Sequence, residues 1–269
     1  MALTKVLITV KTYPTISGKY DELVCTAGFL EDGTWIRIYP VSFRKRTYKE
    51  QYKKYDWIEL DLVKNTSDFR PESYRPKTSD TEIKVIGHID TARNWEERKK
   101  YCLSKVYENL TELIGEAKNK EIGTSLAVFK PTEILDFYAE PVEREWSAKQ
   151  KATLAQQNLF ENKEEFEVVK KLPYRFKFRY TDNAGRESNM MIEDWETGQL
   201  FWNCLARHEG NEQKAIEDVR KKYFDDFAKT KDFYFYLGTT FIHHNRGINP
   251  FIIIGTFHPK KETQMKLFK

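Results

Sequence analysis

The chain has 269 residues, of which 32% are charged and 14% are aromatic, and its formal net charge is +4. Disordered chains are poor in aromatic residues, so this composition excludes disorder and predicts one large domain or two modest ones. The mild positive charge permits a polyanionic partner without requiring one, and no apolar run approaches the ~20 residues of a membrane span.

The first ninety residues are predicted to form β-structure. Apolar, β-branched runs typical of strands cover residues 5–13, 21–30, 34–41, 56–63 and 81–89. Five short strands separated by turns predict a small barrel or curled sheet of the oligonucleotide-binding (OB) or PUA-like kind. The polar segment at residues 64–80 contains two prolines and is predicted to be an exposed loop.

The middle of the chain changes to a helical period. Apolar side chains recur at helical spacing over residues 94–117, which predicts one helix with Asn94 as its N-cap. Short strands are expected at residues 125–129 and 133–138. The strongly polar segment 143–166 is expected to form an exposed helix that connects two halves.

The last hundred residues begin with a clean alternation over residues 172–180. Pairing Tyr180 with Ser188 places Phe178 opposite Met190, whereas a slip of one residue would set aromatic side chains against polar ones. Helices are predicted over residues 194–207 and 212–229, and strands over 232–240 and 249–257, giving a ββααββ unit. The whole chain is therefore predicted to be α+β, with a β-barrel-like module at 1–92, a helical connecting region at 93–164 and an α+β domain at 165–269.

One strand carries the first candidate site. Side chains alternate along a strand, so Ile36 and Ile38 lie on one face and Trp35, Arg37 and Tyr39 on the other. We expect the isoleucines to face the core and the Trp–Arg–Tyr row to face outward, where bases could stack on it. The alternative is that the row packs beneath following structure.

A basic segment follows this row. From residue 35 to residue 54 there are seven basic residues and one acid, with aromatic residues between them. We predict that Arg44, Lys45, Arg46, Lys53 and Lys54 contact phosphates, although charge runs are commonly only solvated faces.

A second basic stripe is predicted on the strand at residues 172–180. Arg175, Lys177 and Arg179 share one face of that strand. Together with the first face, the stripe could hold a long polyanion. Glu187 and Glu193 on the partner strand could instead neutralise it.

Enzymatic readings have weaker support. The sequence contains no GxxxxGK[ST], GxGxxG, GxSxG or HExxH motif. One pattern echoes metal-dependent nucleases, with Asp61 and Glu82 as candidate Mg²⁺ ligands and Lys84 beside them.

The leading prediction is a non-enzymatic nucleic-acid-binding protein, acting on DNA or RNA, with no metal and no cofactor. A metal-dependent nuclease and a protein-binding adaptor are the alternatives. The three cysteines lie far apart without a CxxC pair, and we therefore expect a reducing, cytoplasmic location.

Overall fold

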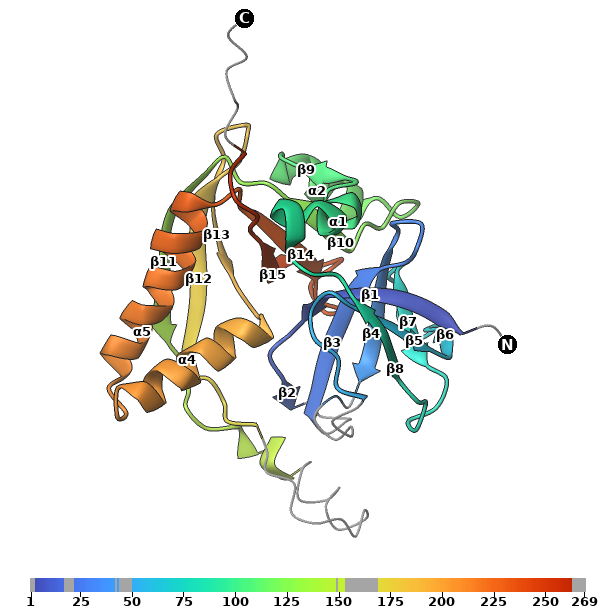
Figure 1. Cartoon of the computed structure of the whole chain (residues 1–269), viewed down its shortest axis with the longest axis horizontal. Helices are drawn as coiled ribbons and strands as arrows, with labels where there is room; N and C mark the ends of the chain where they lie inside the picture. Colours follow the sequence, from blue (N-terminus) through green and yellow to red (C-terminus); the bar gives the residue numbers. More distant parts are fainter. Residues whose placement is uncertain are drawn as a thin grey trace, which may run out of the picture.

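The computed structural model describes residues 3–16, 22–41, 43, 50–148, 150–152 and 169–262. Within these ranges the chain is an α+β structure rich in strands. A curled sheet from the N-terminal third lies on one side, and the helices of the C-terminal third lie on the other (Figure 1). No helix in the described ranges is long and apolar enough to cross a membrane.

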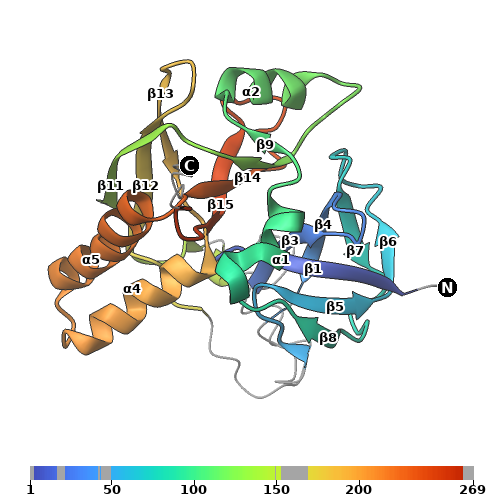
Figure 2. The same cartoon turned by 45° about the horizontal axis from the view of Figure 1, so that its top comes forward.

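The N-terminal sheet is a curled half-barrel. Its strands are β1 (Thr4–Lys11), β2 (Thr15–Ile16), β3 (Glu22–Phe29), β4 (Trp35–Val41), β5 (Asp56–Leu60), β6 (Leu62–Lys64), β7 (Ser73–Pro76) and β8 (Lys84–His88). They follow the order β6-β7-β4-β3-β1-β5-β8, with β2 against β3 (Figure 2). All five predicted strands are present, and the pairs are antiparallel except for β4 with β7.

The segment at residues 64–80 differs from the exposed loop expected there. It supplies β7, and four of its polar residues, Asn65, Asp68, Arg70 and Ser73, are buried. Arg70 Nη2 donates to Asp68 Oδ2 at 2.6 Å, and Ser73 Oγ donates to the same oxygen at 2.7 Å. Because polar groups can be buried when they satisfy one another, polarity alone did not predict exposure here.

The middle of the chain contains α1 (Ala92–Cys102), β9 (Val106–Tyr107), α2 (Leu110–Lys118), β10 (Leu126–Phe129) and β11 (Glu133–Pro141). The single helix expected over residues 94–117 is wrong, because β9 pairs with β10 and divides it. The Asn109 side chain caps α2 by accepting from the backbone N–H groups of Thr111 and Glu112 in the first turn of that helix. The Asn94 side chain instead binds the backbone of Lys260. The helix expected over 143–166 lies largely outside the described residues.

The C-terminal part contains β12 (Tyr174–Thr181), β13 (Glu187–Met191), α4 (Trp195–Arg207), α5 (Glu212–Arg220), the π-helix η3 (Lys221–Ala228), β14 (Tyr234–Thr239) and β15 (Phe251–Phe257). The predicted hairpin register is confirmed, with Tyr180 opposite Ser188 and Phe178 opposite Met190. The strands belong to two sheets, β11-β12-β13 and β15-β14-β10-β9. Each sheet thus combines strands from before and after residue 164, and the domain boundaries stay predictions.

Three buried apolar clusters stabilise this arrangement. One fills the C-terminal part, between its two sheets and the helices α2, α4 and α5. The second lies between one face of the half-barrel and α1, β14 and β15, and the third covers the other face of the half-barrel. Both faces of the N-terminal sheet are therefore buried, and this decides where the predicted site residues lie.

Candidate functional site

The predicted Trp35–Arg37–Tyr39 row does not face outward. The Trp35 ring lies 4.1 Å from the ring of Phe29 and 5.9 Å from that of Tyr236, measured between centroids. The prediction of an exposed stacking row is wrong because β14 and β15 cover this face of the sheet. The strands next to β4 also carry apolar side chains on this face, and an apolar surface of this kind is stabilised by burial.

Arg37 is the most deeply buried member of the row, at 2% exposed. Its guanidinium donates to the carbonyl of Thr239 at 3.2 Å and to the carbonyl of Ser125 at 3.0 Å. Burial and the nearby Arg70 lower the pKa of Arg37 to about 10. These contacts join the half-barrel to the start of β10 and the end of β14. Arg37 therefore has a structural role.

Of the other residues predicted on this first basic face, the structure describes some and not others. Tyr39 is half-buried, and its carbonyl accepts from Asn65 at 3.4 Å. Arg44, Lys45 and Arg46 lie outside the described residues.

The second predicted stripe lies on β12. Lys177 pairs with Glu140 at 2.7 Å, and Arg179 lies 3.5 Å from Glu187. Arg175 is exposed. Carboxylates from β11 and β13 thus neutralise part of the stripe. The alternative given for this stripe predicted such a role for Glu187.

The residues of the nuclease hypothesis lie at the surface in local pairs. Asp61 accepts from Lys77 at 3.1 Å, and Glu82 lies 3.7 Å from Lys84. In the part of the chain that the structure describes, no three His, Cys, Asp or Glu side chains are grouped so as to hold a metal ion.

The strongest candidate site is a pocket of about 530 Å³ at the junction of the half-barrel with α1, α4 and β15. Both β1 and α1 contribute residues to its lining, and Figure 2 shows these two elements near each other. Two of the predicted phosphate-binding residues, Lys53 and Lys54, line it. The complete lining is Lys11, Lys53, Lys54, Tyr55, His88, Trp95, Arg98, Trp195, Glu196, Gln199, Thr256 and His258. We call this set the basic pocket.

Lys11 ends strand β1 and is almost wholly buried in the wall of the basic pocket. Its Nζ donates to the carbonyl of Tyr52 at 3.0 Å and lies over the rings of Phe43, at 4.4 Å, and Trp195, at 5.2 Å. Burial lowers the pKa of Lys11 to about 8, and the charge of Lys54 acts in the same direction. The ammonium is therefore held by aromatic faces and retains its charge at neutral pH.

Lys54 links the half-barrel to α4. Its Nζ lies 2.7 Å from Asp194 Oδ1 and 2.9 Å from Glu196 Oε2. Burial opposes the charge on Lys54, but the two carboxylates raise its pKa overall. Burial raises the pKa of Asp194 to about 6, although Lys54 acts in the opposite direction. We call these three residues the ion cluster.

The opposite wall is built from α1. The Arg98 guanidinium lies 3.7 Å from the centre of the Tyr55 ring and 4.9 Å from that of Trp95, and it donates to the carbonyl of Ile89. The ring of His258 lies 5.0 Å from that of Trp95. Burial lowers the pKa of His258 to about 3, so this imidazole is neutral at physiological pH.

The basic pocket therefore combines cations with aromatic faces. Lys53 is exposed at its mouth, while Lys11 and Arg98 are buried in its walls. Trp95 and Trp195 are both half-buried and line it from opposite elements, α1 and α4. Such a combination can bind a phosphate through charge and a planar ring by stacking.

Sequence reasoning missed most of this pocket. Trp95 lies within the segment for which the sequence predicts one helix, and nothing in the sequence identifies a partner for the carboxylates at the start of α4. A usable signal existed in Lys11, a cation directly after the buried run from Val6 to Val10. A charged residue within such a run needs a partner, but the sequence does not say which one.

Comparisons with known proteins add limited information. A family model described as Domain of unknown function (DUF8757) matches residues 88–269, and a second, Domain of unknown function (DUF8758), matches residues 2–104. No curated protein matches. A solved structure of a murine DNA-binding protein bound to double-stranded DNA is similar over 98% of both chains, at 11% identity and a TM-score of 0.34. At that TM-score the likeness carries no argument.

Proposed function

The chain belongs to the family described as Domain of unknown function (DUF8757), whose description names no activity, and we propose that it is a non-enzymatic nucleic-acid-binding protein. One observation carries the proposal, which is the convergence of Lys11, Lys53 and Arg98 with Trp95 and Trp195 around the basic pocket. The curled half-barrel, which the sequence suggested to be OB- or PUA-like, provides the strands for one wall.

The chemistry of the pocket fits a phosphate with an adjoining base. Lys53 at the mouth and Lys11 in the wall supply positive charge for a phosphate oxygen. The tryptophan faces supply stacking surfaces, each stack contributing on the order of 1–3 kcal/mol whichever base is present. Glu196 and Asp194 are already engaged by Lys54, which limits their repulsion of an anion.

The test is fluorescence anisotropy with labelled single- and double-stranded DNA and RNA at about 50 and 200 mM salt. Lys53→Met removes one charge at the mouth and should weaken binding to every sequence similarly. It should also reduce the slope of log affinity against log salt by about one. Lys120→Met, which removes a charge from an exposed turn after α2, is the matched control and should leave both quantities unchanged.

A pH titration of the same binding probes Lys11. Its ammonium is present below a pKa of about 8 and is lost as the pH rises through that value. Affinity for the oligonucleotide should therefore fall between about pH 7 and pH 9, and Lys11→Met should flatten this fall. Equal affinity of Lys53→Met and Lys120→Met at low salt would contradict the proposal.

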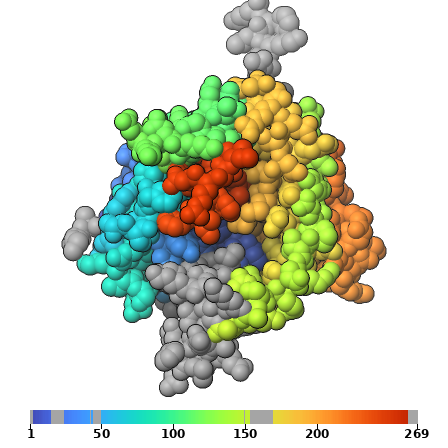
Figure 3. All heavy atoms as spheres, turned by 180° about the vertical axis from the view of Figure 1, so that it is seen from behind, coloured from blue at the N-terminus to red at the C-terminus, as the bar shows by residue number. Residues whose placement is uncertain are grey.

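A protein-binding role is the second candidate, and one observation favours it. Phe69 and Phe241 are each about half exposed, their ring centroids are 5.2 Å apart, and the adjacent Ile242 is 66% exposed. The residues that join β14 to β15 belong to the red surface between the cyan half-barrel and the yellow β12–β13 region (Figure 3). Binding of a protein to this apolar surface would depend weakly on salt, which distinguishes it from phosphate contacts.

A further inference from the structure

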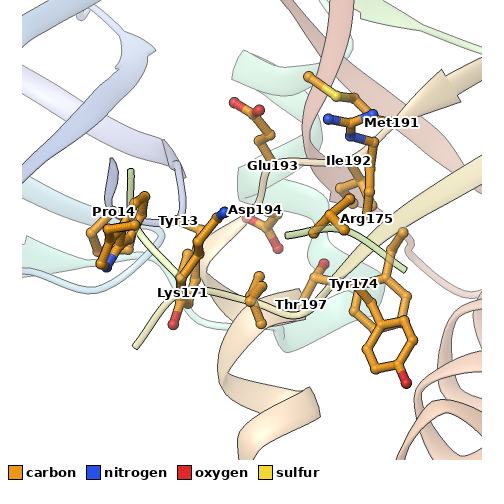
Figure 4. Close-up of a pocket in the computed structure, with 14 residues that line it drawn as sticks. Tyr13, Pro14, Lys171, Tyr174, Arg175, Met191, Ile192, Glu193, Asp194 and Thr197 are labelled. Carbon is orange, nitrogen blue, oxygen red and sulfur yellow. The ribbon is translucent and has the colours of Figure 1, made fainter. Parts of the chain in front are cut away.

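A second pocket, which Asp194 lines, lies between the segment after β1 and the strands β12 and β13 (Figure 4). Its volume is about 170 Å³. Its apolar and aromatic walls include Tyr13, Trp146, Leu172, Tyr174, Phe176 and Ile192. In the space-filling view, dark-blue N-terminal residues are visible at the bottom of a recess beside yellow and lime segments (Figure 3). We call this the amine pocket.

The polar centre of this pocket is the carboxylate of Asp194, whose residue is 1% exposed. Oδ1 accepts from Lys54 at 2.7 Å, but Oδ2 has no hydrogen-bond partner in the described part of the chain. The backbone N–H of Thr197 is near enough to lower the pKa of Asp194 without making a hydrogen bond to Oδ2. Figure 4 shows this carboxylate in the middle of the lining side chains. A buried carboxylate oxygen without a donor is uncommon and calls for one.

Three other polar groups in the walls donate to acceptors within the protein. The Thr197 hydroxyl donates to Tyr223 at 2.7 Å, and the Trp146 indole donates to the carbonyl of Val169 at 3.2 Å. The Tyr174 hydroxyl donates to a carboxylate of α5 at 2.6 Å. A molecule bound in the pocket can supply the donor that Oδ2 lacks among the described residues.

A carboxylate oxygen forms its strongest hydrogen bonds with a positively charged donor. Lys54 already binds Asp194 through Oδ1 and also pairs with Glu196. Lys171 donates to the carbonyl of Glu145 at the exposed rim. The Arg175 guanidinium points toward Met191 and away from Asp194 (Figure 4).

We propose that the amine pocket binds a small organic amine. Its ring lies among the apolar side chains, and its ammonium donates to Asp194 Oδ2. The volume suits one six-membered ring, since a dry cavity of about 150 Å³ accommodates benzene. This site differs in charge from the basic pocket, and it does not depend on the proposed binding of nucleic acid.

The experiment is a protein-observed NMR titration with benzylamine, benzyl alcohol and benzoate. Asp194→Asn keeps an oxygen for Lys54 and can place an amide N–H₂ where Oδ2 now lies, so it should remove amine binding. Val142→Trp fills the pocket from a half-buried position at its edge. Glu193→Gln is the matched control, because the Glu193 carboxylate points away from that of Asp194 (Figure 4). Thermal melting establishes that each variant is folded.

We expect benzylamine to bind the native protein at least about tenfold more tightly than benzyl alcohol, the factor for one charge-assisted hydrogen bond. Benzoate should not bind, and Glu193→Gln should bind benzylamine within about twofold of the native protein. Both Asp194→Asn and Val142→Trp should lose about tenfold or more. Should Asp194→Asn not fold, Val142→Trp alone decides the site. Equal binding of amine and alcohol, no binding of either, or undiminished binding in Val142→Trp would overturn the proposal. Oligonucleotide affinity should be unchanged in Val142→Trp, so the two binding functions fail or succeed separately.

Discussion

Replacing Lys54 by Met should destabilise the fold far more than the same change at Lys53. Lys54 is 5% exposed at its side chain, and its partner Asp194 is 0% exposed. Met keeps most of the aliphatic volume but leaves the Asp194 carboxylate buried without its cation. Breaking a buried pair in this way costs about 3–5 kcal/mol of unfolding free energy. At about 2–4 °C per kcal/mol for a chain of this size, the melting temperature should fall by roughly 6–20 °C.

The loss should depend on pH in a defined direction. Burial raises the pKa of Asp194 from 3.8 to about 6, so its contribution to stability is fully present below 3.8 and is lost as the pH rises through about 6. Removing Lys54 takes away the charge that lowers this pKa, so the pKa of Asp194 rises further. The penalty of Lys54→Met should therefore be larger at pH 7 than at pH 5, where Asp194 is protonated.

Urea denaturation of the native protein, Lys54→Met and Lys53→Met at pH 5 and pH 7 measures these differences. Lys53 is exposed, and Lys53→Met should change the unfolding free energy by no more than about 0.5 kcal/mol. The reasoning is refuted if the two variants are equally stable at pH 7, or if the Lys54→Met penalty grows as the pH falls.

Three further outcomes can be checked. Trp35→Ala should lower the unfolding free energy by about 3 kcal/mol in denaturant titrations, because the Trp35 ring packs against the buried cluster between the sheets. A loss of oligonucleotide binding without destabilisation would contradict this. Gly28→Ala should lower the unfolding free energy by about 1–3 kcal/mol or more, because the added Cβ would lie 1.9 Å from a backbone oxygen. Gly87→Ala, in another strand of the same sheet, places its Cβ in open space and is the control. Equal melting temperatures of the two variants would be inconsistent with this packing. Asp61→Ala with Glu82→Ala should leave oligonucleotide binding intact, and the native protein should show no Mg²⁺- or Mn²⁺-dependent cleavage; cleavage abolished in this double variant would favour the nuclease.

Local pattern was enough for most of the strands, though not for β2, β7 or β9, and for one register. The alternation of aromatic and charged residues over residues 174–181 identifies the inner face of β12, and the register with Tyr180 opposite Ser188 places Phe178 against Met190 on β13. These features depend on neighbours within a few residues, so a sequence contains them directly.

The break between α1 and α2 could not be predicted from the local sequence pattern. Apolar spacing continues across residues 103–109, but Val106–Tyr107 within them form β9 because β10 offers a parallel partner. Pairing with a strand about twenty residues further along the chain outweighed the local helical period.

The candidate site was decided by tertiary structure. Arg37 binds a carbonyl 202 positions away, and Lys54 pairs with a carboxylate 140 positions away. The sequence determined that cations and aromatic residues are abundant near residues 35–54, but not which of them remain available to a ligand. Burial depends on which distant elements cover each face of the half-barrel, and β14, β15 and α4 cover Trp35, Arg37 and Lys54 while leaving Lys53 exposed.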